Sequence, residues 1–145
     1  MSTVPAPQAP DETRMKHLEL LQITIGRLGA NSFLIKGWAM TVSGSLITVA
    51  TGGAGWTVAV IALMMTSGLW LLDAYYLEQE RLFRSLYNRS LTSDTPPVPP
   101  FSMDVERFAQ PVPWRRVALS RTMTLFYGTF ALVDLAATAL LLTVS

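Results

Sequence analysis

Three charged side chains interrupt the apolar runs of this sequence, and they are the residues whose types could do chemistry there. Lys36 lies in the first turn of one run, Asp73 at the end of a second, and Asp134 well inside a third. An ionisable group inside a bilayer is costly, and such groups mark ion paths, proton relays or structural pairs. These intramembrane charges are therefore the candidate site residues.

Lys36 and Asp73 are predicted to pair. An uncharged, glycine-rich turn at residues 51–55 separates the first two apolar runs. At 1.5 Å per helical residue, Lys36 lies about 22 Å before this turn and Asp73 about 25 Å after Trp56, which follows it. The two charges should therefore lie at similar depth on neighbouring helices. The alternative is that each reaches water independently, Lys36 by snorkelling to the headgroups.

Asp134 is expected to lie deeper, because it follows Arg121 by thirteen residues, about 20 Å of helix. Tyr127 and Thr138 share its helical face and would form a polar face of the third span. Asp134 is then either a neutral acid bonded to a hydroxyl or part of a pore or proton path in an oligomer, unless the third helix is kinked or shallower. The candidate hydroxyls belong to Thr41, Ser45 and Thr66.

The composition excludes several other kinds of site. There is no cysteine, a single histidine (His17), and a net charge of only +1. Thiolate and histidine-rich metal sites are therefore not expected, nor is binding of nucleic acid through bulk charge. The sequence contains no phosphate loop and no nucleophile elbow. We expect no catalytic residues, no metal and no cofactor, and hence no enzyme.

The elements that must position the three charges are transmembrane helices. All eleven Lys and Arg residues lie between Arg14 and Arg121, and none lies from Gly37 to Glu80. Apolar runs of about 20 residues are long enough to cross a bilayer. The sequence therefore predicts an all-α integral membrane protein with spans at residues 33–51, 56–73 and 122–144. Because basic residues collect on the cytoplasmic side, the N-terminus should be cytoplasmic and the C-terminus outside.

The segments outside the spans complete one membrane domain, residues 12–145. We expect a disordered cytoplasmic tail, an amphipathic helix, a helix that extends the second span into the cytoplasm, and a Pro-rich loop; these cover residues 1–11, 12–30, 74–91 and 92–113. The amphipathic helix has an apolar stripe at helical spacing, Leu18, Leu21, Ile25 and Leu28. The stripe could pack on another helix of the chain, self-associate or lie on the membrane.

A second stripe, on the first span, consists of small residues at spacings of four, three and four: Gly37, Thr41, Gly44 and Thr48. Small residues allow two helices in a membrane to approach closely. This helix-packing face could serve packing within the chain or the formation of a homo-oligomer.

Four stretches of the sequence carry a resemblance: residues 16–22, 27–38, 72–83 and 101–103. Over roughly residues 15–105, the chain resembles a group of small bacterial membrane proteins, some of which are encoded as accessory or effector genes in antiphage defence loci. This resemblance implies a location in the bacterial inner membrane and a role in antiviral defence.

Two functions are consistent with these expectations. The first is a channel-like, oligomeric membrane effector or accessory protein that acts through membrane association or permeabilisation. The second is a membrane anchor or scaffold whose cytoplasmic helices dock a cytoplasmic protein without conducting ions. The lipid bilayer is a partner in both.

Overall fold

The chain is all-helical in the computed structural model, which describes residues 9–92 and 98–144. Within these residues no strand occurs, and three helices are long and apolar enough to cross a membrane. The elements are α1 (Ala9–Val49), the π-helical turn η1 (Ala50–Ala54), α2 (Trp56–Leu91), α3 (Val105–Phe108), α4 (Trp114–Ala118) and α5 (Arg121–Val144). The predicted all-helical class with three membrane-length helices is confirmed.

Helix α1 is continuous where the sequence predicted two helices, at residues 12–30 and 33–51. The connecting residues include no proline, and a single glycine such as Gly29 inside a helix costs only about 1 kcal/mol relative to alanine. Nothing in the chain therefore ends the helix before the turn. Because α1 begins at Ala9, it also includes the end of the predicted disordered tail, residues 1–11. The rest of that tail lies outside the described residues.

The turn between α1 and α2 depends on two glycines. Gly53 has φ of 114° and Gly55 has φ of 86°, backbone conformations that residues with a Cβ rarely adopt. The amide of Gly55 donates to O of Ala50 at 3.2 Å, which closes the turn. The chain therefore reverses within a few residues at the predicted glycine-rich turn, and α1 and α2 form a tight helical hairpin.

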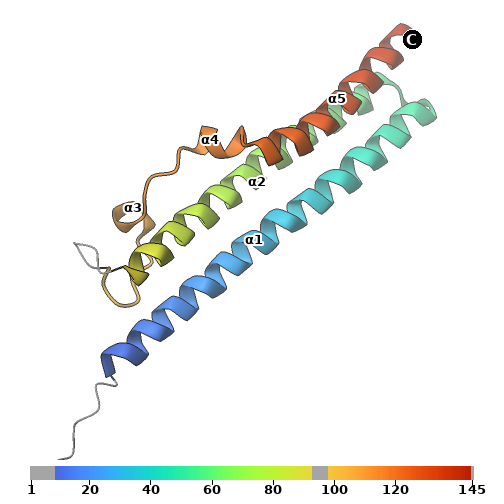
Figure 1. Cartoon of the computed structure of the whole chain (residues 1–145). Coiled ribbons are helices and arrows are strands. Elements are labelled where there is room, and N and C mark those ends of the chain that lie inside the picture. Colours follow the sequence, from blue (N-terminus) through green and yellow to red (C-terminus); the bar gives the residue numbers. More distant parts are fainter. Residues whose placement is uncertain (1–8, 93–97, 145) are drawn as a thin grey trace, which may run out of the picture.

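Helices α1 and α2 run side by side for almost their full length, and α5 packs on α2 near the hairpin turn (Figure 1). One buried cluster joins all three: Ala39, Ala74, Ala118, Met123 and Tyr127. A second, Leu21, Leu86 and Phe108, joins α1, α2 and α3 at the other end of the hairpin. Leu21 is one of the four residues of the predicted amphipathic stripe, and this residue packs within the chain.

The predicted Pro-rich loop, residues 92–113, is partly helical. Helix α3 interrupts it, and the carboxylate of Asp104 caps this helical turn by accepting from the amide of Arg107 at 3.1 Å. Helix α4 then begins directly after Pro113, whose φ of −62° suits the start of a helix. A short break at residues 119–120 separates α4 from α5.

The outer surfaces of the three long helices are strongly apolar. Phe33, Met64 and Leu132 are 79%, 69% and 70% exposed, one on each of α1, α2 and α5. Such large apolar side chains are unfavourable in water but are well solvated by lipid. The exposed surface therefore fits insertion in a membrane.

Candidate functional site

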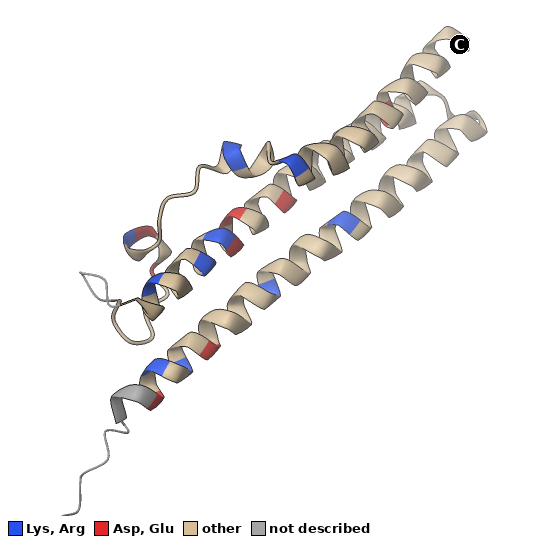
Figure 2. Ribbon diagram, viewed as in Figure 1, with Lys and Arg blue, Asp and Glu red and all other residues tan. Residues whose placement is uncertain are grey.

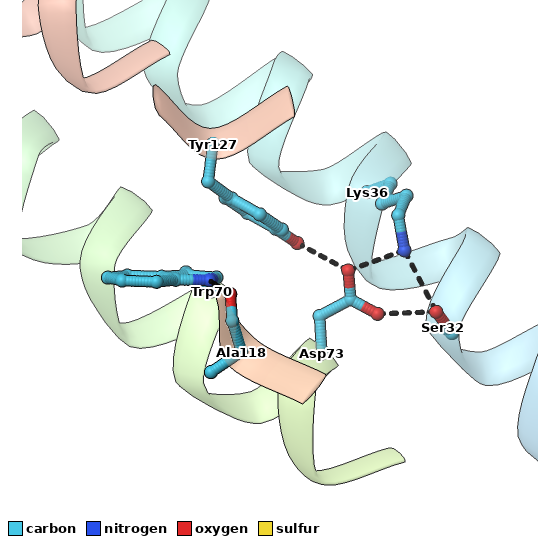
Figure 3. A network of polar contacts seen from close by, with 6 residues as sticks. All are labelled: Ser32, Lys36, Trp70, Asp73, Ala118 and Tyr127. Carbon is cyan, nitrogen blue, oxygen red and sulfur yellow. Dashed lines mark hydrogen bonds and ion pairs between the residues drawn. The ribbon is translucent and has the colours of Figure 1, made fainter. Parts of the chain in front are cut away.

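Lys36 of α1 and Asp73 of α2 form an ion pair between the two helices of the hairpin. Nζ of Lys36 lies 2.5 Å from Oδ2 of Asp73. The Asp73 side chain is fully buried, whereas that of Lys36 is 22% exposed. The structure therefore brings these two charges together, as the depth count from the turn predicted (Figure 3).

Two hydroxyls complete the environment of Asp73. Ser32 of α1 donates to Oδ1, and Tyr127 of α5 donates to Oδ2 at 3.0 Å. Lys36 Nζ also donates to Oγ of Ser32 at 2.9 Å, which closes a ring of contacts around the carboxylate. The carboxylate of Asp73 thus accepts from both of the other membrane-length helices, so this α2 residue holds α1 and α5 together (Figure 3).

Trp70, one turn before Asp73, fixes the start of the third span. Its indole Nε1 donates to O of Ala118 at 3.1 Å. Ala118 is the last residue of α4, and the last carbonyls of a helix have no partner within the helix. The indole therefore satisfies one of these carbonyls and positions α4, and with it the beginning of α5, against α2 (Figure 3).

Asp134 of α5 is the centre of a second buried polar cluster. Ser43 of α1 donates to its Oδ1 at 2.9 Å, and Thr66 of α2 donates to its Oδ2 at 3.0 Å. Asp134 is 0% exposed. Because a hydroxyl can both donate and accept, the same geometry suits an ionised carboxylate or a neutral acid that donates to one hydroxyl.

The two clusters are related by a repeat of seven residues on every helix. Lys36, Asp73 and Tyr127 meet in the first cluster, and Ser43, Thr66 and Asp134 lie seven residues from them in the second. Seven residues are two helical turns, about 10 Å. A seven-residue repeat of contacts is typical of helices packed as in a coiled coil.

The repeat continues along the α1–α2 hairpin in both directions. Towards the turn, the next positions are Ala50 and Ala59, both fully buried. Away from the turn, Gly29 lies beside Glu80, and Gln22 donates to the hydroxyl of Tyr87 at 3.2 Å. The polar clusters are therefore two layers within one regularly packed hairpin.

Some predicted partners of Asp134 lie elsewhere. Thr41 and Ser45 are exposed, so of the three predicted hydroxyls only that of Thr66 reaches Asp134. The hydroxyl of Tyr127 contacts Asp73 instead, because helical side chains lean towards the N-terminus of their helix. Thr138 donates at 2.7 Å to the backbone oxygen of Asp134, within its own helix. Ser32 and Ser43 were not predicted as site residues.

The predicted helix-packing face of α1 makes no contact with another helix in the part of the chain that the structure describes. Gly37, Thr41, Gly44 and Thr48 are all exposed. A Cβ added at Gly37 or Gly44 would meet no atom within 4 Å. The two threonines donate to O of Gly37 and Gly44 at 3.0 and 2.8 Å, within α1 itself. The buried face of α1 contains instead Ser32, Ile35, Ala39 and Ser43, and Ala50 at the start of η1 is buried as well.

The end of the hairpin opposite the turn is closed by contacts between distant segments. We call this part the stalk: residues 12–30 of α1, residues 74–91 of α2, and α3. Arg14 donates to O of Ser90 and O of Leu91 at 3.1 and 2.9 Å, and so satisfies carbonyls at the end of α2. Nε2 of His17 lies 3.0 Å from O of Ser102. The stalk is thus a defined structure rather than a pair of separate helices.

The buried carboxylates do not form part of a metal-binding group. Among the described residues, no three His, Cys, Asp or Glu side chains lie close enough to hold a metal ion. The contacts of Asp73 and Asp134 are hydrogen bonds and an ion pair within the helical bundle.

Comparison with protein-family profiles, with curated proteins and with solved structures gives no match for this chain.

Proposed function

We propose that this protein is an accessory protein of the bacterial inner membrane whose stalk docks a cytoplasmic protein and whose spans anchor it without conducting ions. In this proposal the N-terminus is cytoplasmic and the C-terminus is outside. The distribution of charge supports the orientation, since Lys and Arg gather on the stalk and on the segment that leads to α5 (Figure 2). Basic residues favour the cytoplasmic side.

The observation that carries this proposal is that both buried carboxylates are hydrogen-bonded inside one chain. Asp73 has Lys36 and two hydroxyls as partners, and Asp134 has two hydroxyls. Both aspartates are 0% exposed. A carboxylate that lines an ion path must offer its oxygens to water or to the ion. Here the oxygens face neighbouring helices, which supports a structural role.

The stalk offers a surface for a partner. Met15, Leu20 and Ile23 on α1 are 67%, 42% and 53% exposed. Ile23, the one of these nearest the spans, precedes Lys36 by thirteen residues, about 20 Å of helix, and so lies beyond the apolar segment. Exposed apolar residues in water favour contact with another protein. We propose that these side chains form part of the docking surface.

The experiment is site-specific photocrosslinking in cells that express the full chain. A photoreactive residue replaces Leu20 or Ile23 on the stalk, and a matched one replaces Thr51 in the turn. The expected result is a crosslink to one cytoplasmic protein from the stalk positions, lost when Met15 is changed to Glu, and none from position 51. Crosslinks from both regions to the same abundant proteins would contradict docking.

The second candidate is an oligomeric effector that permeabilises the membrane, as in an antiphage defence system. The observation that favours it is the exposed face of Gly37, Thr41, Gly44 and Thr48, which leaves room for a second copy. Three spans cannot enclose a pore alone, so this function requires association of several copies. A Gly44→Leu change should abolish permeabilisation in this case and leave docking by the stalk unaffected.

A further inference from the structure

A groove lined by polar and charged residues opens on the stalk along one face of α2, where the chain that follows α3 returns beside the helix. Its volume is about 430 Å³, within the usual range of about 300–1,000 Å³ for sites that bind small molecules. Three arginines line it, together with polar side chains: Arg81, Arg84, Arg89, Ser85, Asn88 and Gln110. None of the described residues that line it is acidic.

Within the described residues, the positive charge of the groove is only partly balanced. Arg84 pairs with Glu80 at 2.5 Å, whereas neither Arg81 nor Arg89 forms an ion pair with any residue that the structure describes. Nη1 of Arg89 donates to O of Phe108 at 3.0 Å. Its Nε is buried and has no hydrogen-bond partner among the described residues. The guanidinium of Arg89 is therefore held in place, but its charge has no counterpart among the residues that the structure describes.

The helix repeat places these groups on one surface. Arg81, Ser85 and Arg89 follow one another at intervals of four residues, and Asn88 lies beside them. Oγ of Ser85 accepts a hydrogen bond from the backbone amide of Gln110 at 2.9 Å, so the O–H of Ser85 is available to donate. Guanidinium groups with hydroxyl and amide donors are suited to the oxygens of a phosphate.

The position of the groove indicates where its ligand comes from. Arg81 and Arg89 follow Asp73 by eight and sixteen residues, about 12 and 24 Å along α2. The headgroup layer of one leaflet is only about 5–8 Å thick. The groove thus extends beyond the lipid headgroups into water. We propose that it binds a soluble small molecule that carries a phosphate or diphosphate group.

The test uses the full chain in nanodiscs of phosphatidylcholine, with pyrophosphate as the probe and isothermal titration calorimetry as the measurement. We expect saturable binding that an Arg81→Gln/Arg84→Gln variant weakens by about tenfold or more, as loss of charge-assisted hydrogen bonds predicts. The matched control is Arg27→Gln/Arg116→Gln, which removes the same charge from exposed residues outside the groove. It should change the affinity by less than about twofold, since charges on the surface are screened by salt.

Two further measurements keep the test decisive. The thermal unfolding midpoint of each variant shows that lost binding is not lost folding. If the double variant unfolds, Arg81→Lys replaces it; this change keeps the charge, removes the planar fork and should still weaken binding. Three results would overturn the proposal: no saturable binding to the native chain, equal weakening by the control variant, or binding only in nanodiscs that contain phosphatidylglycerol.

Discussion

The carboxylates of Asp73 and Asp134 have the same relationship to the bundle, since each accepts hydrogen bonds from the two membrane-length helices to which it does not belong. Asp73 of α2 is contacted from α1 and α5, and Asp134 of α5 from α1 and α2. Lipid tails are as apolar as leucine, so helices in a membrane associate through packing and polar contacts rather than through the hydrophobic effect. The two aspartates therefore act as cross-links between the spans.

Exchanging the charges of the first pair should restore most of the stability that either single change removes. Lys36→Asp alone and Asp73→Lys alone each place two like charges together, and either should lower the free energy of unfolding by about 2–4 kcal/mol. The double exchange restores an opposite pair. Unfolding in mixed detergent micelles measures the effect, and a double variant no more stable than the worse single one would show that the pair does not contribute.

Tyr127→Phe should destabilise the bundle through the loss of one hydroxyl. The change keeps the ring in its buried position and removes the donor to Oδ2 of Asp73, a bond to a charged group worth about 1.5–3 kcal/mol. Tyr75→Phe is the matched control, because Tyr75 is 51% exposed and its hydroxyl has no hydrogen-bond partner among the described residues. Equal unfolding free energies for the two variants would contradict the contact.

Ser43→Ala should lower the stability of the protein only when residue 134 carries a carboxyl group. In the native chain this change removes one of the two donors to Asp134 and should cost about 1–2 kcal/mol. In an Asp134→Leu background the hydroxyl has no partner on α5 to lose, so the same change should cost less than about 0.5 kcal/mol. Thr66→Ala should behave in the same way. Identical costs in both backgrounds would mean that the hydroxyls act independently of Asp134.

A leucine introduced on each of the two faces of α1 should have opposite effects on stability. Ala39 is 0% exposed in the three-helix cluster, so Ala39→Leu should destabilise the protein by about 1–3 kcal/mol through overpacking. Gly44 has no atom within 4 Å of the added Cβ, so Gly44→Leu should leave the unfolding of the single chain unchanged or slightly improved. Thermal unfolding of monomeric material, checked by light scattering, measures both. A large loss from Gly44→Leu would place a helix of the same chain against that face.

The fold could be predicted from the sequence where the chain contains residues that end a helix. The glycine-rich turn gave a common reference from which the distance of each residue along its helix could be counted. Residue spacing alone was therefore enough to place Lys36 and Asp73 together. The division of α1 into two helices was wrong because the sequence between them has no breaker, and the change from polar to apolar composition does not end a helix. The composition of a helical segment indicates whether water or lipid surrounds it, but it does not indicate where the helix begins or ends.

The partners of the carboxylates were harder to predict, because they depend on the rotation of each helix. Ser43 is the partner of Asp134, whereas its neighbours Thr41 and Ser45 face away. A difference of two residues turns a side chain by about 200° around a helix, so the correct depth alone does not select the right hydroxyl. The spacing of seven residues from Lys36 to Ser43 was the available signal, because it repeats in Asp73 to Thr66 and in Tyr127 to Asp134.

The central claim is that the protein is a membrane anchor whose buried carboxylates have a structural role. Ion flux from proteoliposomes tests this claim most directly. The purified full chain is reconstituted in vesicles loaded with potassium, and a potential-sensitive dye reports efflux; a second assay reads the same dye in cells after induced expression. We predict no flux above that of protein-free vesicles for the native chain and for Asp134→Asn, and no depolarisation of the cells. Flux from the native chain that Asp134→Asn abolishes would show that this carboxylate belongs to an ion path, and would contradict the account.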